Sequence, residues 1–267
     1  MPIEVLLSLL VGLITGIAGA FLGLGGGFIF VPFFHLALGL PIHKAVGSSL
    51  AAILFLTSSA FTAYLLQRRV DFKLALIIEA AAAPSAFLGA WLTQFLSSTY
   101  LRAAFAILTV YAGLYMLLAL KVSGKGCSRI YSWRRKLRDR WGLSFEYMVD
   151  PLFAGLGGVG VGLVSGMLGV GGGIVAVPLM TVVLGVPIHV AIATVSLTNL
   201  ANAVSGFGGH LMLGNVDFAI ALVAGVGALL GAQLGPRICR RTQPTVLRRI
   251  VGLVLIIIAL RMLISGS

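Results

Sequence analysis

The chain has 267 residues, of which 59% are hydrophobic and only 10% are charged. A typical soluble protein contains about 25% charged residues. This composition lacks the polar side chains that a water-exposed surface requires, which excludes an ordinary soluble protein. The lipid bilayer is therefore expected to surround most of the chain.

The net charge of +12 comes from cations that cluster in short segments between apolar stretches. Eight of the nineteen Lys and Arg residues lie in 121–140, five lie in 237–249, and three are Arg68, Arg69 and Lys73. Such clusters are typical of the positive-inside pattern that sets membrane orientation. They predict cytoplasmic loops and do not indicate a nucleic-acid partner.

Two sets of five apolar stretches flank a polar central segment. The first set covers 3–22, 28–40, 45–66, 74–96 and 101–120, and the second covers 152–169, 174–186, 190–213, 217–236 and 247–264. About twenty apolar residues cross a bilayer, and the second stretch of each set is shorter. We therefore expect a first membrane repeat (1–120), a basic cytoplasmic linker (121–150) that is interfacial and partly helical, and a second membrane repeat (151–267).

The two sets are copies of one another. A shift of 146 positions places the GLGGG cluster (23–27) on GVGGG (169–173), and GLPIH (39–43) on GVPIH (185–189). The same shift aligns Asp71 with Asp217, each expected to cap the helix that follows it. Chance similarity between apolar segments would not keep Asp, His and Pro aligned. A local gap is expected only near residues 80–100, where Gly89 resembles Gly231.

An odd number of crossings in each repeat would give the two repeats opposite orientations. The charges agree, because the basic loop at 68–73 has a counterpart at 214–217 without a cation, and the basic loop at 237–241 has a neutral counterpart at 97–100. If the second stretch of each set entered the membrane and returned, each repeat would cross four times and the repeats would be parallel. The charges therefore favour a full crossing by these stretches, through a short or broken helix. Both termini are then expected to be non-cytoplasmic.

The predicted fold is therefore an all-α integral membrane protein with two inverted-topology repeats of about five hydrophobic segments each. Short or broken Gly-rich helices are expected near the midplane. Many secondary transporters have this architecture, with their substrate sites between the repeats.

The leading substrate-binding candidates are two glycine triplets: Gly25, Gly26, Gly27 and Gly171, Gly172, Gly173. Consecutive glycines are poor helix formers and permit positive φ. A helix that starts after such a break presents free N–H groups, which suit an anion. The alternative is close packing of helices through small residues, an interpretation that also fits the four-residue spacing of Gly158, Gly162 and Gly166.

The third stretches are rich in hydroxyl and amide side chains. The substrate-binding candidates among them are Ser48, Ser49, Thr194, Thr198, Asn199 and Asn202. Thr194, Thr198 and Asn202 recur every four residues and therefore share one helix face. Polar side chains at this density within spans either line a pathway or join helices by hydrogen bonds.

Glu79 is the one carboxylate well inside an apolar stretch, and Gly225 takes its place in the second repeat. An intramembrane acid is costly, so Glu79 is a candidate for proton coupling, the alternative being a structural pair with a neighbouring helix. His43 and His189 are candidates for gating or proton transfer, or simply interfacial residues of a helix start. The scattered His and Cys residues predict no catalytic cluster, metal site or cofactor.

The twin GxGGG and VP motifs, each followed by a GxPxHxA turn and a hydroxyl-rich stretch, resemble the sulfite exporter TauE/SafE family. The resemblance covers nearly the whole chain outside the central segment. It implies a bacterial or archaeal cytoplasmic-membrane protein that exports sulfite or a small organosulfonate such as sulfoacetate, driven by an ion gradient. A different family, of thiosulfate importers, uses cysteines along its path, whereas Cys127 and Cys239 are expected in basic loops here.

These observations predict a secondary transporter that exports a small sulfur-containing anion, with proton coupling as one option. Its expected partners are the anion and the lipid bilayer, and homo-oligomerisation is left open. The alternatives are a channel, or an integral-membrane enzyme acting on a lipid-soluble substrate. An enzyme is expected to concentrate His, acidic or Cys residues at one membrane face, which this sequence does not do.

Overall fold

The computed structural model describes residues 2–118 and 133–241, together with 249, 253, 256–257 and 259–260 of the last apolar stretch. The first repeat contains α1 (Pro2–Leu22), α2 (Gly27–Pro32) with the π-helical turn η1 (Phe33–Ala37), α3 (Ile42–Leu66), α4 (Phe72–Leu92) with the 3-10 turn η2 (Thr93–Phe95), and α5 (Ser98–Leu118). Then follow β1 (Trp133–Arg138), β2 (Ser144–Val149), α6 (Pro151–Leu168), α7 (Gly173–Pro178) with η3 (Leu179–Val183), α8 (Ile188–Met212) and α9 (Phe218–Arg241).

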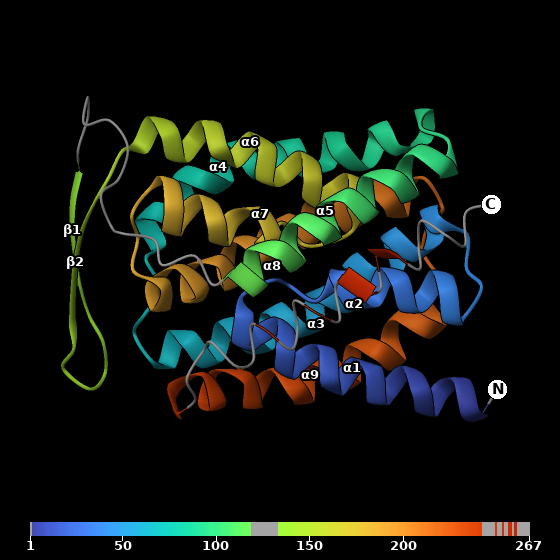
Figure 1. Cartoon of the computed structure of the whole chain (residues 1–267), viewed down its shortest axis with the longest axis horizontal. Coiled ribbons are helices and arrows are strands. Elements are labelled where there is room, and N and C mark those ends of the chain that lie inside the picture. The colour runs from blue at the N-terminus through green and yellow to red at the C-terminus, as the bar shows by residue number, and fades with distance from the viewer. Residues whose placement is uncertain are drawn as a thin grey trace.

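The helices lie side by side in one bundle, with the two strands standing across one end (Figure 1). α4 and α6 lie on one face of the bundle, α1 and α9 lie on the opposite face, and α3 and α8 lie between them (Figure 1). Among the described residues, six helices are long and apolar enough to cross a membrane, namely α1, α3, α4, α6, α8 and α9. The prediction of a helical, multi-pass membrane protein is confirmed.

The helical part of the second segment of each repeat is shorter than a membrane span. α2 with η1 has six α-helical and five π-helical residues, and α7 with η3 has the same lengths. At about 1.5 Å per residue each reaches about 16 Å, roughly half of a hydrocarbon core of about 30 Å. The expected short, broken helices of the second segments are therefore present. The first of them folds back on α1, since a Cβ added at Gly26 would lie 2.8 Å from Cγ2 of Thr15.

Small residues let α6 pack on α4, and α1 on α9, with their backbones in contact. A Cβ added at Gly162 of α6 would overlap the carbonyl oxygen of Ala82, and one at Gly16 of α1 would overlap that of Ala228. The two contacts are equivalent, because Gly162 is 146 positions from Gly16 and Ala82 is 146 positions from Ala228. The packing interpretation of the glycines spaced by four is confirmed for α6.

The 146-residue register continues through residues 80–100, so the predicted local gap is wrong. A Cβ added at Gly89 would meet the carbonyl oxygen of Leu163, and one at Gly235 would meet that of Ile17. Gly89 therefore corresponds to Gly235. Gly231 lies one turn earlier on the same packed face of α9, which explains its misleading resemblance.

Helix ends follow the local sequence signals, with one exception. Asp71 Oδ1 and Asp217 Oδ1 each accept a hydrogen bond of 3.2 Å from the first turn of the following helix, so both predicted caps are confirmed. α9, however, continues to Arg241, past the expected end at 236. Cys239 therefore lies within a helix and not in a loop. The basic residues that predicted a loop form the last turn of this helix, where positive charge is favourable. Cys127 lies outside the described residues.

The basic linker contains a β-hairpin where a partly helical segment was expected. β1 and β2 pair antiparallel, with Trp133 opposite Val149 and Arg135 opposite Tyr147. Along β1, half-buried and exposed side chains alternate. The cations of 134–138 occupy both faces of this strand, which hid the alternation in the sequence. The part of the linker before Trp133 lies outside the described residues.

Two ion pairs with buried carboxylates hold the hairpin on the loop between α3 and α4. Arg135 binds both oxygens of Asp71 at 2.9 and 2.6 Å, and Tyr147 donates to the same carboxylate at 2.6 Å. Arg69 binds Asp139 at 3.2 and 2.8 Å. Both carboxylate side chains are 0% exposed. Because these partners are distant in sequence, no local pattern predicts them.

Replacing Arg135 by Ala is expected to destabilise the protein by about 3 kcal/mol, because Asp71 would stay buried with an unpaired charge. Arg134→Ala is the matched control, since Arg134 pairs with Glu146 at the surface with its side chain 76% exposed. An exposed pair contributes less than about 1 kcal/mol. Thermal unfolding of both variants in detergent measures the difference, and equal unfolding temperatures would contradict the anchoring role of Arg135.

Acid is expected to release the hairpin. Burial by itself would raise the pKa of Asp71, but the hydrogen bonds from Arg135 and Tyr147 outweigh it and hold that pKa below its ordinary value. The resulting stabilisation is complete above the unfolded-state pKa of about 4 and is lost as the pH falls through the lower folded value.

Trp133 reports on this release, because Arg135 lies 4.4 Å from the centre of its ring. In a background with Trp91→Phe and Trp141→Phe, its fluorescence is expected to stay constant from neutral pH to about pH 5 and to change below about pH 4. A transition centred near neutral pH would show that another group controls the attachment.

Candidate functional site

The two glycine loops meet in the middle of the bundle. A Cβ added at Gly25 would lie 3.1 Å from the side-chain nitrogen of Asn199, and one at Gly171 would lie 3.3 Å from Cγ2 of Ile53. Asn199 and Ile53 are each the twelfth residue of a 25-residue helix, α8 and α3 respectively. Both loops therefore lie near the midpoint of the long helices.

The triplets require glycine for two separate reasons. Positive φ values between 78° and 90° occur at Gly25, Gly26, Gly171 and Gly172. Residues with a Cβ adopt this region at a cost of about 1–2 kcal/mol. The third glycine of each triplet is needed for close approach, because a Cβ at Gly27 would overlap the carbonyl oxygen of Gly169, and one at Gly173 would overlap that of Gly23. The two repeats thus touch through their backbones.

Side chains of the opposite repeat hold the carbonyl groups of the loops. Ser49 Oγ donates to the Gly169 oxygen at 2.8 Å, and Asn199 Nδ2 donates to the Gly23 oxygen at 3.2 Å. Gly23 and Gly169 are repeat counterparts, so the two bonds have equivalent roles. Asn199 Oδ1 is buried and has no hydrogen-bond partner among the described residues. It could therefore accept a hydrogen bond from a ligand.

Glu79 lies one side chain away from the second glycine loop. Asn202 Nδ2 donates to Glu79 Oε1 at 3.0 Å and joins α8 to α4. The same Nδ2 would lie 3.4 Å from a Cβ added at Gly172. Glu79 Oε2 and Asn202 Oδ1 are buried acceptors without a partner in the described part of the chain. A proton on Oε2 would supply the donor that this pair lacks.

The repeat counterparts of this polar pair are an apolar residue and a glycine. Leu56 stands in the register position of Asn202, and Glu79 has Gly225 as its counterpart. Leu56 Cδ1 would lie 2.7 Å from a Cβ added at Gly26. The junction of the loops is therefore polar beside the second loop and apolar beside the first.

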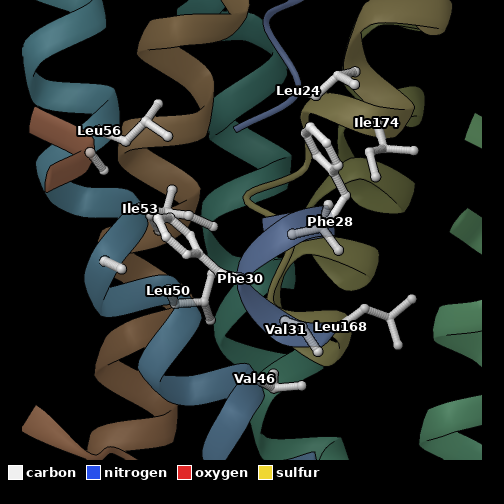
Figure 2. Packing of buried hydrophobic residues seen from close by; sticks show 14 of the residues in the cluster. Leu24, Phe28, Phe30, Val31, Val46, Leu50, Ile53, Leu56, Leu168 and Ile174 are labelled. Carbon is white, nitrogen blue, oxygen red and sulfur yellow. The ribbon is translucent and has the colours of Figure 1, made fainter. Parts of the chain in front are cut away.

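Figure 2 shows the apolar side of the junction, where Phe30 of α2 lies against Leu50 and Ile53 of α3. Leu24, between the glycines of the first loop, lies beside Ile174 of α7 (Figure 2). All five side chains are buried. This packing holds α2 against α3, and the first glycine loop against α7.

Ser48 and Thr194 lie away from the glycine loops and join helices of opposite repeats. Ser48 Oγ accepts a hydrogen bond from the Asp217 backbone N–H at 2.8 Å, and Thr194 Oγ1 accepts one from the Asp71 backbone N–H at 3.0 Å. The two bonds are repeat counterparts of one another. For these two candidates the contacts favour the helix-joining interpretation over a pathway role.

Three further candidates are not brought to the loops by any described contact. Thr198 Oγ1 donates to the Val195 oxygen of its own helix at 3.2 Å. His43 and His189 are each the second residue of their helices, α3 and α8, and are half-buried. At about 1.5 Å per residue they lie about 15 Å along the helix from the level of the loops.

One pair of equivalent residues was not recognised in the sequence. His210 Nε2 bonds the Gly166 oxygen at 2.9 Å, and Tyr64 donates its hydroxyl to the Ala20 oxygen at 2.8 Å. His210 and Tyr64 are 146 positions apart, as are Gly166 and Ala20. The register alone could have paired them, but the difference in residue type concealed the shared role.

Comparison with known proteins places these features in a family. Residues 8–262 match the sulfite exporter TauE/SafE family. The probable membrane transporter protein YunE of Bacillus subtilis is 29% identical, covering 96% of this chain and 96% of its own length. Probable membrane transporter proteins MJ0441 of Methanocaldococcus jannaschii (97% and 95% covered) and YfcA of Escherichia coli (96% and 87% covered) are each 26% identical. No solved structure matches.

The family match is not confined to one motif. It spans both glycine loops, the long helices α3 and α8 that hold them, and Glu79. The relatives match over nearly their full lengths and are named as membrane transporters, which fits a chain with several candidate spans. The chain therefore belongs to the sulfite exporter TauE/SafE family of membrane transporters.

Proposed function

We propose that the protein is a secondary transporter that exports a small sulfur-containing anion, such as sulfite or sulfoacetate, through a site at the glycine loops. The observation that carries this proposal is the meeting of the two loops at mid-depth, each leading into a short apolar segment. The first N–H groups of a helix have no partner within it, and the helix dipole favours negative charge there. The family name supports the sulfur chemistry.

The polar groups at the junction suit a weakly held anion. Ser49, Asn199 and the loop backbone are neutral, so release is not opposed by a fixed cation. The unpartnered Asn199 Oδ1 is an acceptor, which favours an anion that carries its own O–H donor, such as hydrogensulfite. Fully deprotonated sulfate offers no such donor.

The two repeats are proposed to lie in the membrane with opposite orientations. Supporting this, equivalent contacts recur in both repeats, as in the pairs Asp217 with Ser48 and Asp71 with Thr194. Arg69 and the basic hairpin lie together at one end of the bundle, and by the positive-inside rule that end is cytoplasmic. α1 begins at the opposite end (Figure 1), and we propose that the N-terminus faces the outside.

Proton coupling is proposed to run through Glu79. Its hydrogen bond to Asn202 connects a carboxylate within a span to the second glycine loop. Uptake of a proton on Oε2 would remove the negative charge and turn this atom into a donor. The charge that an anion experiences at the loop would then depend on protonation.

A flux screen in proteoliposomes tests the proposal. Sulfite, sulfate, sulfoacetate and taurine are compared with acetate as a carboxylate control. We expect transport of sulfite or sulfoacetate and none of acetate. Transport of acetate alone would overturn the sulfur assignment, and a steady ion conductance without substrate exchange would favour a channel.

A further inference from the structure

A second site lies at the hairpin end of the bundle, apart from the glycine loops. A pocket of about 680 Å³ opens between the ends of α3 and α9 and the turn of the hairpin. Its lining includes Leu66, Gln67, Arg140, Trp141, Leu234 and Arg237. The candidate spans of α3 and α9 end at Leu66 and Ile238. The pocket therefore lies at the level where the helices leave the bilayer.

The charge of this pocket is positive. Arg140 and Arg237 line it, and none of the described lining residues is acidic. Asp139, adjacent to Arg140 in the chain, is already engaged by Arg69 through Oδ2 and by the Trp141 backbone N–H through Oδ1. Asp139 is thus committed to other partners, and the two guanidinium groups give the pocket a net attraction for an anion.

The remaining walls are apolar and reach the lipid-facing surface. Leu66 is 64% exposed and Leu234 is 42% exposed, both near the ends of spanning helices. Trp141 forms a further wall, positioned by Arg69 at 5.3 Å from its ring centre. Trp is characteristic of the membrane interface. A small free anion would gain nothing from these surfaces, whereas a lipid would cover them.

The pocket also contains a buried polar atom without a partner. Gln67 is only 9% exposed, and its Nε2 donates to the Pro236 oxygen at 3.4 Å. Its Oε1 has no hydrogen-bond partner among the described residues. An amide oxygen in this position accepts a hydrogen bond from a ligand hydroxyl or ammonium group.

We propose that this pocket binds an anionic phospholipid, with its phosphate at Arg140 and Arg237 and an acyl chain along Leu66 and Leu234. A headgroup with hydroxyls, such as that of phosphatidylglycerol, donates to Gln67 Oε1. Basic pockets between spanning helices on the cytoplasmic side recognise anionic headgroups through the same chemistry. The site is independent of the transported anion.

Native mass spectrometry of the full chain in detergent, with added phosphatidylglycerol or phosphatidylcholine, tests the assignment. We expect phosphatidylglycerol to be retained preferentially. Because each cation contributes roughly fivefold to the affinity, the double variant Arg140→Gln and Arg237→Gln is expected to weaken phosphatidylglycerol binding about twenty-fivefold. Arg134→Gln is the matched control, because it removes an exposed hairpin cation outside the pocket and leaves the affinity unchanged.

Three results would overturn the proposal. The first is equal retention of phosphatidylglycerol by the wild type and the double variant. The second is equal retention of phosphatidylcholine and phosphatidylglycerol by the wild type. The third is displacement of bound phosphatidylglycerol by inorganic phosphate or sulfite, which would identify a site for free oxoanions.

Discussion

Replacing Glu79 by Gln is expected to abolish transport driven by a pH gradient while substrate exchange without a gradient continues. Gln preserves the shape of the side chain and can still accept from Asn202 Nδ2, a bond of 3.0 Å in the wild type. It cannot take up or release a proton. Radiolabelled substrate flux into proteoliposomes, with and without an imposed gradient, measures the two activities separately.

Glu146→Gln provides the control for Glu79. Glu146 is a hairpin carboxylate with its side chain 42% exposed, paired with Arg134 and Lys136 outside the helix bundle. Its replacement is expected to leave gradient-driven flux unchanged. If Glu79→Gln retained gradient-driven flux equal to that of Glu146→Gln, Glu79 would be excluded as the proton carrier. Its bond to Asn202 would then be structural.

Replacing Gly173 by Ala is expected to disrupt the junction of the two loops. The new Cβ would overlap the Gly23 carbonyl oxygen, which is itself fixed by Asn199. Overpacking of this kind costs about 1–3 kcal/mol or more. If about 1.4 kcal/mol of the strain falls on the conformation that binds the anion, flux per folded molecule drops about tenfold.

Gly160→Ala is the control for this substitution. Gly160 lies on α6, and a Cβ added there has no neighbouring atom within 4 Å. Because Ala is the better helix former by up to about 1 kcal/mol, this variant should keep wild-type stability and flux. Size-exclusion yield and unfolding temperature separate folding from transport. Equal flux in both variants would remove the close contact of the loops from the mechanism.

Much of the fold could be predicted because the residues that the two repeats share determine local structure, such as helix ends. Pro, Asp and Gly mark helix starts, caps and breaks, so the aligned pair Asp71 and Asp217 identified two equivalent helix ends. The short helices α2 and α7 were predicted as well, because a run of glycines before a shortened apolar stretch marks them in the sequence. Elements without such a signal were predicted less well, and the β-hairpin was missed because the cations of 134–138 lie on both faces of β1.

The site was only partly predictable, because its key contacts join residues far apart in sequence. Ser49 and Asn199 were candidates because they are polar residues of long apolar helices, but the sequence did not show that each holds a loop of the other repeat. Glu79 has no acidic counterpart, because Gly225 stands at its position in the second repeat. Its partner Asn202 lies 123 positions away and has a Leu at the equivalent position of the first repeat.

The opposite orientation of the two repeats is tested most directly by labelling their equivalent turns. Arg68 and Gly214 are repeat counterparts, both exposed, with φ values of 56° and 69°. In a background with Cys127→Ser and Cys239→Ser, Arg68→Cys and Gly214→Cys are treated separately with a membrane-impermeant maleimide, in right-side-out and inverted vesicles. We predict that Arg68→Cys reacts only from the cytoplasmic side and Gly214→Cys only from the outside. Reaction of both from the same side would contradict inversion and the transport mechanism built on it.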